Sequence, residues 1–209
     1  DFWILSRTNS LIQEYTERLE KHDYQKCLSL MTEFINEDLS RTYIKLIRER
    51  ADQDETVGYV FRYVWERISK LLAPLAPYIS DYIYQSIETK SVHLTQWPKS
   101  DKKLIKKDIE NNMNHTRKII QEILNARNKQ QLGVRWPLKQ VEITAKEEQI
   151  KAAKKLQDLI KLQVNCKKLK LNLSTKEELI VALDTTMTPE LEKEGFSREV
   201  IRRIQDLRK

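Results

Sequence analysis

Three cations recur at helical spacing in the segment "DLSRTYIKLIRER", residues 38 to 50. At about 100° per residue, Arg41, Lys45 and Arg48 fall on one side of a helix and an apolar face lies nearly opposite. That apolar face consists of Leu39, Tyr43, Leu46 and Ile47. Such a row of cations can bind the phosphates of a nucleic acid, but long basic side chains also simply keep an outer helix face solvated. Other features of the sequence must decide between these two interpretations.

A tryptophan and an arginine lie one turn apart near the start of the chain. Residues 1–21 predict a first helix with a single apolar arc, and Trp3 and Arg7 fall outside that arc. An outward-facing indole beside a guanidinium suits stacking on an unpaired base together with a phosphate or base-edge contact. The alternative is that Trp3 packs on a neighbouring domain.

The sequence contains no recognisable catalytic or metal-binding constellation. Cys27 and Cys166 have no CxxC partner, and His22, His93 and His115 lie in separate segments without metal-ligand spacing. The phosphate-binding, dinucleotide-binding and nucleophile motifs GxxxxGK[ST], GxGxxG and GxSxG are absent. We therefore expect a binding protein that needs no cofactor or metal of its own.

The charge of the chain favours an anionic partner. Its 38 Lys and Arg outnumber 31 Asp and Glu, which gives a formal net charge of +7. The cations cluster in residues 99–108, 150–170 and 197–209, and each cluster is either a solvated face, a set of phosphate contacts or both. No run approaches the roughly 18 uncharged apolar residues of a membrane span, and no signal peptide is evident. The sequence thus predicts a cytoplasmic protein without membrane contact, and a monomer.

Long helices should dominate the first part of the chain, because only 3 Gly and 5 Pro occur in 209 residues. Helical periodicity covers residues 1–21, 24–36, 55–73 and 100–131, while Pro74 and Pro77 must separate two helices. The segment before Pro98 is expected to be an extended strap. Amphipathic helices with short connections bury their apolar faces against one another, so residues 1–131 predict a helical bundle.

The segment "LGVRWPL", residues 132–138, interrupts the helical pattern and predicts a junction between domains. Residues 139–209 then predict a small β-α-β-β unit followed by a closing helix, with Thr188 as its N-cap and Pro189 in its first turn. Gly195 should weaken that helix by about 1 kcal/mol relative to alanine. The predicted fold class is therefore mainly α, a helical bundle followed by a small α+β subdomain and a C-terminal helix.

Several segments together resemble one family. They are "WILSRTNSLI", "FINEDLSRTYIKLIRER", "LLAPLAPYISDYIYQSI", "VRWPL" and "EGFSREVIRRIQDLRK". In this order and spacing they are similar to the C-terminal part of class I aminoacyl-tRNA synthetases, specifically the isoleucyl enzymes of the archaeal and eukaryotic-cytosolic type. The resemblance implies that the bundle binds the anticodon of tRNA(Ile). It also implies that ATP, with Mg, is used by N-terminal catalytic and editing domains, because neither an HIGH-type nor a KMSKS-type motif occurs here. The chain should therefore be an inactive fragment of an isoleucine-tRNA ligase.

The resemblance also suggests which residues touch the tRNA. Its motifs carry over to Trp3 and Arg7 in the first helix and to Asn36, Arg41, Tyr43, Lys45 and Arg48 in the second segment, with Tyr43 expected in the core. Thr42 departs from the aromatic residue that many members have. Lysines and arginines would hold phosphates, while Trp3, Arg7 and Asn36 would contact unstacked bases. Arg135 and Trp136 would either touch the tRNA or fasten the two domains together.

Two alternatives remain open from the sequence. The chain could be the same region of a valyl- or leucyl-tRNA synthetase, or a non-catalytic helical adaptor whose basic faces meet acidic proteins.

Overall fold

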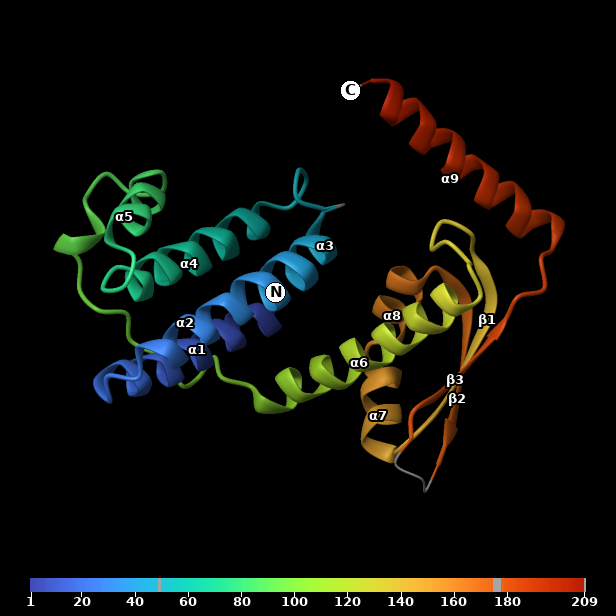
Figure 1. Ribbon diagram of the computed structural model, residues 1–209, viewed down its shortest axis with the longest axis horizontal. Helices are drawn as coiled ribbons and strands as arrows, with labels where there is room; N and C mark the ends of the chain where they lie inside the picture. The colour runs from blue at the N-terminus through green and yellow to red at the C-terminus, as the bar shows by residue number, and fades with distance from the viewer. Residues whose placement is uncertain (49, 175–177, 209) are drawn as a thin grey trace. The chain divides into compact units, whose positions relative to one another are not determined.

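The computed structural model describes residues 1–48, 50–174 and 178–208 (Figure 1). It divides into two compact units, Asp1–Glu110 (unit 1) and Asn111–Lys209 (unit 2), which are described separately. The division falls inside one long helix, whereas the sequence predicted the boundary at residues 132–138. The reason is that Ile119 and Ile123, on the later turns of that helix, are fully buried in the core of unit 2.

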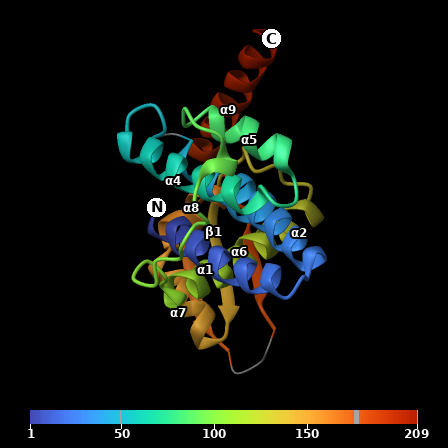
Figure 2. The same cartoon turned by 90° about the vertical axis from the view of Figure 1, so that its left-hand side faces the viewer.

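Unit 1 is a bundle of helices. Its elements are α1 (Phe2–Glu20), α2 (Tyr24–Glu33), the π-helix η1 (Phe34–Tyr43), α3 (Ile44–Ile47), α4 (Glu55–Leu72), α5 (Pro77–Gln85), the short 3-10 helix η2 (Val92–Leu94) and the first turn of α6 (Lys107–Lys129). Helix α1 contacts α2, η1 and α4 and is the central helix of the unit (Figure 2).

Local signals set the ends of these helices. The side chains of Asp23 and Asp54 accept backbone N–H groups at the starts of α2 and α4, which is the usual stabilisation of an N-cap. Helix α4 ends at Leu72, and Pro77 occupies the first turn of α5. The predicted bend between Pro74 and Pro77 is thus confirmed.

The helix predicted from Ser100 begins only at Lys107. Side chains of α1 bind the backbone of the intervening segment instead: the amide of Asp101 donates to Asn9 Oδ1 (2.8 Å) and the amide of Lys106 donates to Ser6 Oγ (2.8 Å). These two amides are taken by α1, and between them the chain forms a turn in which the amide of Leu104 donates to the carbonyl of Asp101 (3.1 Å), so no helix begins before Lys107.

Unit 2 is a small α+β structure, as predicted. Strands β1 (Leu138–Ala145), β2 (Cys166–Leu173) and β3 (Ile180–Asp184) form a sheet in the order β2-β1-β3, with β1 parallel to β2 and antiparallel to β3. The predicted crossover helix is two helices, α7 (Glu147–Lys155) and α8 (Gln157–Val164), and α9 (Pro189–Leu207) closes the unit.

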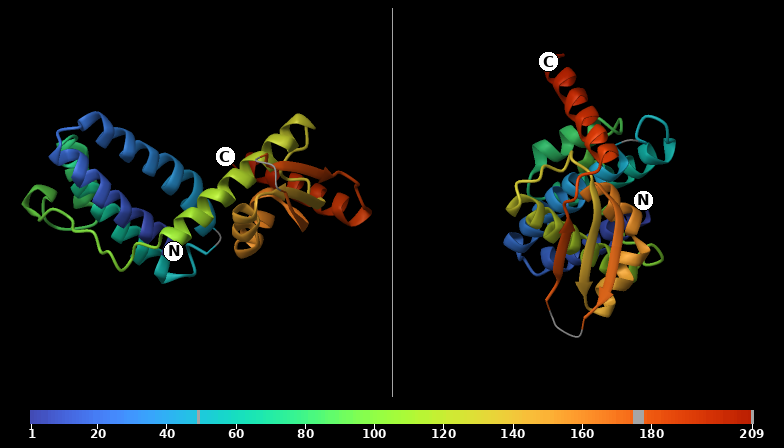
Figure 3. Two further views of the ribbon diagram at one scale, coloured as in Figure 1. Left: turned by 90° about the horizontal axis from the view of Figure 1, so that it is seen from below. Right: turned by 90° about the vertical axis from the view of Figure 1, so that its right-hand side faces the viewer.

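The sheet of unit 2 has one apolar and one polar face. Val141, Ile143 and Ala145 of β1 point to the core that is shared with α6, α7 and α8. Alternate residues such as Gln140, Glu142 and Thr144 lie on the other face, which Figure 3 shows toward the viewer in its right-hand view. In the described part of the chain, no helix combines the length and the apolarity that a membrane crossing requires.

Candidate nucleic-acid interface

Figure 1 shows α2, η1 and α3 as one continuous helical segment, and the predicted cationic row lies along its second half, with Arg48 directly after α3. The residues on its inner side, Phe34, Leu39, Tyr43 and Ile47, are buried. Arg41, Lys45 and Arg48 are all exposed. The helical-wheel prediction is therefore confirmed for the three cations and for Leu39, Tyr43 and Ile47, whereas Leu46 is only half-buried. We call Arg41, Lys45 and Arg48 the cationic stripe.

The charges of the cationic stripe are only partly neutralised. Arg41 Nη1 donates to Glu37 Oε1 at 2.7 Å, four residues earlier on the same surface. Lys45 and Arg48 have no ion-pair partner among the described residues. Exposed ion pairs contribute little to stability, so the stripe can exchange the Arg41 contact for a phosphate at small cost.

The π-helix brings the stripe and a polar hollow onto the same outer face. In η1 the hydroxyl of Thr42 donates to the carbonyl of Glu37, five residues earlier, at 2.7 Å. Upstream of the stripe, exposed Asn36 lines a shallow hollow together with Gln25, Leu28, Ser29, Thr32, Glu33 and Glu37. This hollow offers amide and hydroxyl groups, and π-helical segments occur often at functional sites.

The end of the stripe is fixed to the first residue of the chain. The Tyr43 hydroxyl donates to Asp1 Oδ1 at 2.6 Å, and Arg50 pairs with Asp1 and, at 2.8 Å, with Asp54. Burial raises the pKa of Tyr43 to about 12, so the phenol remains a hydrogen-bond donor at neutral pH. Tyr43 is a core residue, as predicted.

The prediction that Trp3 faces outward is wrong. The indole is buried, with 5% of its surface exposed, and its Nε1 has no hydrogen-bond partner among the described residues. The helical wheel failed because α1 is the central helix and is buried on several sides. Small polar residues, Ser6, Thr8 and Asn9, are buried together with its apolar arc. A buried indole cannot stack on a base without rearrangement of the bundle.

Arg7 is half-buried and is bound by two buried carboxylates. Its Nε donates to Asp38 Oδ2 at 3.0 Å, and its Nη1 lies 3.6 Å from Glu110 Oε2. Burial opposes ionisation of Glu110, but hydrogen bonds from Ser6, Ser10 and Lys107 together lower its pKa below the ordinary value. Arg7 therefore links α1, η1 and the first turn of α6, and its predicted outward contact with RNA has no support in its placement.

Arg135 and Trp136 contact α9 within unit 2. The indole of Trp136 lies edge-to-face with Phe196, with ring centroids 5.5 Å apart, and rests directly on Gly195. Exposed Arg135 lies 3.5 Å from Glu199. The indole thus fastens the turn at residues 132–138 to α9, and Gly195 is required because a larger side chain would overlap the ring.

Sequence reasoning missed the residue that organises this turn. Arg127 is completely buried, and its guanidinium donates to the carbonyls of Gly133 (2.5 Å), Trp136 (2.5 Å) and Val164 (3.2 Å). Burial lowers its pKa from the ordinary value. No carboxylate pairs with it among the described residues, so backbone carbonyls alone compensate the buried charge.

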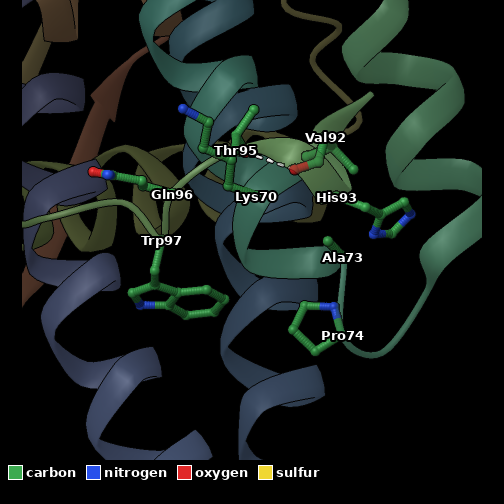
Figure 4. Close-up of a pocket in the computed structure, with 8 residues that line it drawn as sticks. All are labelled: Lys70, Ala73, Pro74, Val92, His93, Thr95, Gln96 and Trp97. Carbon is green, nitrogen blue, oxygen red and sulfur yellow. Dashed lines mark hydrogen bonds between the residues drawn. The ribbon is translucent and has the colours of Figure 1, made fainter. Parts of the chain in front are cut away.

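A second hollow, of about 230 Å³, lies in unit 1 beside the end of α4 (Figure 4). Three of its polar side chains already have partners: the Trp97 indole donates to Thr16 Oγ1 (2.9 Å), Lys70 bonds Glu66 (2.7 Å), and His93 Nε2 lies 3.2 Å from the Pro77 carbonyl. The described residues contain no group of three or more His, Cys, Asp or Glu side chains that could hold a metal ion.

Comparison with known proteins identifies the family. The family model described as "Anticodon-binding domain of tRNA ligase" matches residues 1–144, which is more than half of the chain. The chain belongs to this family of anticodon-binding domains. The match includes unit 1, all of α6 and most of β1.

This anticodon-binding domain is similar to archaeal isoleucine–tRNA ligases. It is 33% identical to the enzyme of Thermococcus kodakarensis over 99% of the chain, and 34% identical to that of Pyrococcus abyssi over 91%. The enzyme of Methanopyrus kandleri is 33% identical over 87% of the chain. The alignments cover 20%, 19% and 18% of these relatives, so the chain spans about a fifth of their length.

Within the anticodon-binding domain, the structure keeps only part of the predicted site accessible. The cationic stripe and Asn36 are exposed on the outer face of α2, η1 and α3. Trp3 and Arg7 are removed from that surface by burial and by ion pairing.

Proposed function

We propose that the chain binds the anticodon arm of tRNA(Ile) through the outer face of α2, η1 and α3. The observation that carries this proposal is the cationic stripe, in which Lys45 and Arg48 are exposed and lack an ion-pair partner among the described residues. Membership in the anticodon-binding family supports tRNA as the ligand. The three relatives reported above are isoleucine–tRNA ligases, which supports tRNA(Ile) over the valine and leucine alternatives.

The division of roles on this face follows from its chemistry. Arg41, Lys45 and Arg48 bind phosphates, which positions the RNA without reading its sequence. Asn36 and its neighbours Thr32 and Ser29 offer the hydrogen-bond donors and acceptors that base edges require. Base recognition therefore rests on amides and hydroxyls, since Trp3 is buried.

The chemistry of aminoacylation belongs, in this proposal, to the remainder of a longer ligase. Catalytic and editing parts of that ligase would bind ATP with Mg and join isoleucine to the tRNA that this chain holds. We also propose that this ligase is cytoplasmic and that the chain is a monomer.

A salt titration tests the proposal. The double variant Lys45→Gln with Arg48→Gln is compared with Lys90→Gln with Lys99→Gln, which removes the same charge from exposed positions elsewhere in unit 1. The measurement is filter binding of tRNA(Ile) and tRNA(Val) at several salt concentrations. Each lost phosphate contact should lower the slope of log K against log salt by about 0.7–0.9 and weaken binding roughly fivefold at 0.15 M salt.

The expected result is a slope reduced by about 1.4–1.8 in the stripe variant alone. Equal slopes in the two variants would contradict the assignment of the stripe. Equal affinity for the two tRNAs in the unmodified chain would contradict the choice of tRNA(Ile).

A further inference from the structure

The hydrogen bonding of η1 decides which residues share its outer face. The amide of Ile44 donates to the carbonyl of Leu39, five residues earlier, which is the π-helical pattern. Asn36 and Arg41 are also five residues apart, and both are exposed. One π-helical turn therefore brings them nearly above one another, whereas five residues of an α-helix turn by about 500° and would leave them about 140° apart around the axis. The π-helical form thus places the polar hollow beside the cationic stripe.

The π-helical form of η1 needs support from other elements. π-Helical segments are rare and usually short, and η1 extends over ten residues. The buried side chains of Phe34 and Leu39 attach η1 to the bundle, but the free energy of apolar burial has no direction. Such contacts allow more than one rotational setting of the helix, so a directional contact must select the one that is observed.

Asp38 provides a directional contact in the middle of η1. It lies between Asn36 and Arg41 in the chain and is 4% exposed. Its Oδ2 accepts the Nε–H of Arg7 from α1 at 3.0 Å. Because the guanidinium is planar, its N–H groups donate only in fixed directions. The bond therefore ties this turn of η1 to α1 in one orientation.

The guanidinium of Arg7 is held from its other side by a fixed carboxylate. Its Nη1 lies 3.6 Å from Glu110 Oε2. The same carboxylate accepts hydrogen bonds from Ser10 Oγ (2.7 Å) and Lys107 Nζ (3.1 Å), so both α1 and α6 determine its position. Arg7 is therefore a fixed link between η1 and two other helices.

The simpler explanation is that this network only stabilises the bundle. Buried ion pairs contribute little net stability, however, because desolvation of the two charges offsets most of their attraction. An apolar pair at positions 7 and 38 could join α1 to η1 equally well, but it would not fix the orientation of η1. The network is thus better suited to selecting one arrangement than to strengthening the contact.

We infer that Arg7 is a positioning residue for RNA recognition, which acts through Asp38 to hold η1 in the π-helical form that brings Asn36 and Arg41 together on the outer face. Arg7 itself does not touch the RNA. The inference rests on the proposed function for the identity of the RNA, but the effect of Arg7 on η1 can be measured without any RNA.

The test compares Arg7→Lys with the control Tyr63→Phe in the whole chain. Lysine keeps a positive charge beside Glu110 but lacks the planar group that fixes the direction of the bond to Asp38. Tyr63→Phe removes the hydrogen bond by which Asn9 joins α1 to α4 (2.8 Å), and it leaves η1 unchanged. Each variant therefore alters one contact between α1 and a neighbouring helix. Circular dichroism identifies conditions in which both variants are folded.

Hydrogen exchange without RNA is the first measurement. In Arg7→Lys the amides of residues 34–43 should exchange at least about tenfold faster, because a change between π-helical and α-helical bonding breaks their hydrogen bonds. In Tyr63→Phe these amides should keep the rates of the unmodified chain. Equal rates for residues 34–43 in the two variants would overturn the inference.

Filter binding of tRNA(Ile) and tRNA(Val) at several salt concentrations is the second measurement. In Arg7→Lys the ratio of the two affinities should fall about three- to tenfold, which corresponds to one misplaced hydrogen bond. The salt slope should fall by at most about 0.9, the share of Arg41 alone, because Lys45 and Arg48 follow η1. A role in stability alone predicts an unchanged ratio for folded protein, and that result would reject the inference.

The double variant Arg7→Met with Asp38→Leu separates positioning from stability, and it replaces Arg7→Lys if that variant does not fold. An apolar pair in place of a buried ion pair usually leaves stability unchanged or raises it. The fold should therefore persist, while the ratio of affinities falls about as far as in Arg7→Lys. A folded double variant with an unchanged ratio would show that the directional bond is not needed.

The two measurements also separate this inference from the proposed function. Discrimination between the tRNAs that survives in both Arg7 variants supports the proposed function and rejects the role of Arg7. An unmodified chain that does not distinguish the two tRNAs rejects the proposed function. Faster exchange of residues 34–43 in Arg7→Lys then still supports the hold of Arg7 on η1.

Discussion

Replacement of Arg127 by alanine should destabilise unit 2 selectively. The guanidinium of Arg127 bonds the carbonyls of Gly133, Trp136 and Val164, which joins the end of α6 to the turn at residues 132–138 and to the end of α8. The side chain of Asn165 completes this arrangement by donating to the carbonyls of Val134 (2.8 Å) and Arg135 (3.1 Å). Without Arg127, the buried carbonyl of Val164 and the partly buried carbonyls of Gly133 and Trp136 lose a charged donor, and a cavity opens between these segments.

The expected loss of stability follows from the number of hydrogen bonds removed and from the desolvation cost of the buried guanidinium. Hydrogen bonds to charged groups contribute about 1.5–3 kcal/mol each, but the buried guanidinium itself carries a desolvation cost of several kcal/mol. The net loss should therefore be about 3–5 kcal/mol, which is the range for breaking a buried charged contact. Arg127→Met keeps much of the volume but leaves the carbonyls unpaired, so most of this loss should remain.

Hydrogen exchange measured by mass spectrometry can assign the loss to one unit. In Arg127→Ala, peptides from β1 and β2 should lose protection, while peptides from α1 and α4 should keep it. The control is Lys129→Ala, an exposed position on the same turn of α6, for which less than about 0.5 kcal/mol is expected. A loss below about 1 kcal/mol in unit 2, or an equal loss in both units, would show that the carbonyl contacts do not hold the turn.

Two further predictions concern stability. Gly195→Ala should lower the free energy of unfolding in urea by about 1–2 kcal/mol, because the new methyl overlaps the Trp136 indole and this outweighs the gain in helix propensity. Gly58→Ala, at a position of α4 with nothing within 4 Å, should instead raise it by up to about 1 kcal/mol. If both variants changed the stability in the same direction, the explanation would be refuted. Because its pKa is lowered in the folded state, ionised Glu110 contributes to the free energy of unfolding of unit 1. This contribution is complete above the ordinary pKa of 4.5 and is lost as the pH falls through the lower pKa of the folded state. In Glu110→Gln the free energy of unfolding of unit 1 should therefore change less with pH in the acid range. An unchanged pH dependence would show that the hydrogen bonds to this carboxylate do not stabilise the unit.

The fold class could be predicted because periodic burial dominates most of the chain. In α4, the apolar residues Val57, Val60, Val64, Ile68 and Leu71 recur at helical spacing, and all five are buried. The strands of unit 2 alternate apolar and polar residues in the same reliable way. Such patterns depend only on neighbours in sequence, so a single sequence contains them.

The placement of Trp3 and Arg7 could not be predicted in this way. The position of Arg7 depends on Asp38 and on Glu110, whose carboxylates come from other elements, 31 and more residues away along the chain. A helical wheel shows where the apolar residues lie, but it cannot show that the polar side of α1 is also covered. The same limit applies to Arg127, since a single arginine near the end of a helix resembles a common favourable partner of the helix dipole.

The net charge of each unit can be counted from the sequence only when the boundary between the two units is known. With the division at Glu110, the cations Arg117, Lys118, Arg127 and Lys129 belong to unit 2, and unit 1 becomes nearly neutral. The boundary itself followed from the burial of α6 in the core of unit 2, which no local pattern reveals.

The cationic stripe and the charge excess of unit 2 act over different distances. At physiological salt, exposed charges interact over about 8 Å, so a three-residue stripe on a neutral unit attracts RNA only when the two are nearly touching. The larger excess of unit 2 raises the local concentration of a polyanion around the whole chain. In the proposed function, the cationic stripe therefore holds phosphates at short range, while the discrimination between tRNAs rests on the hydrogen-bonding groups beside it.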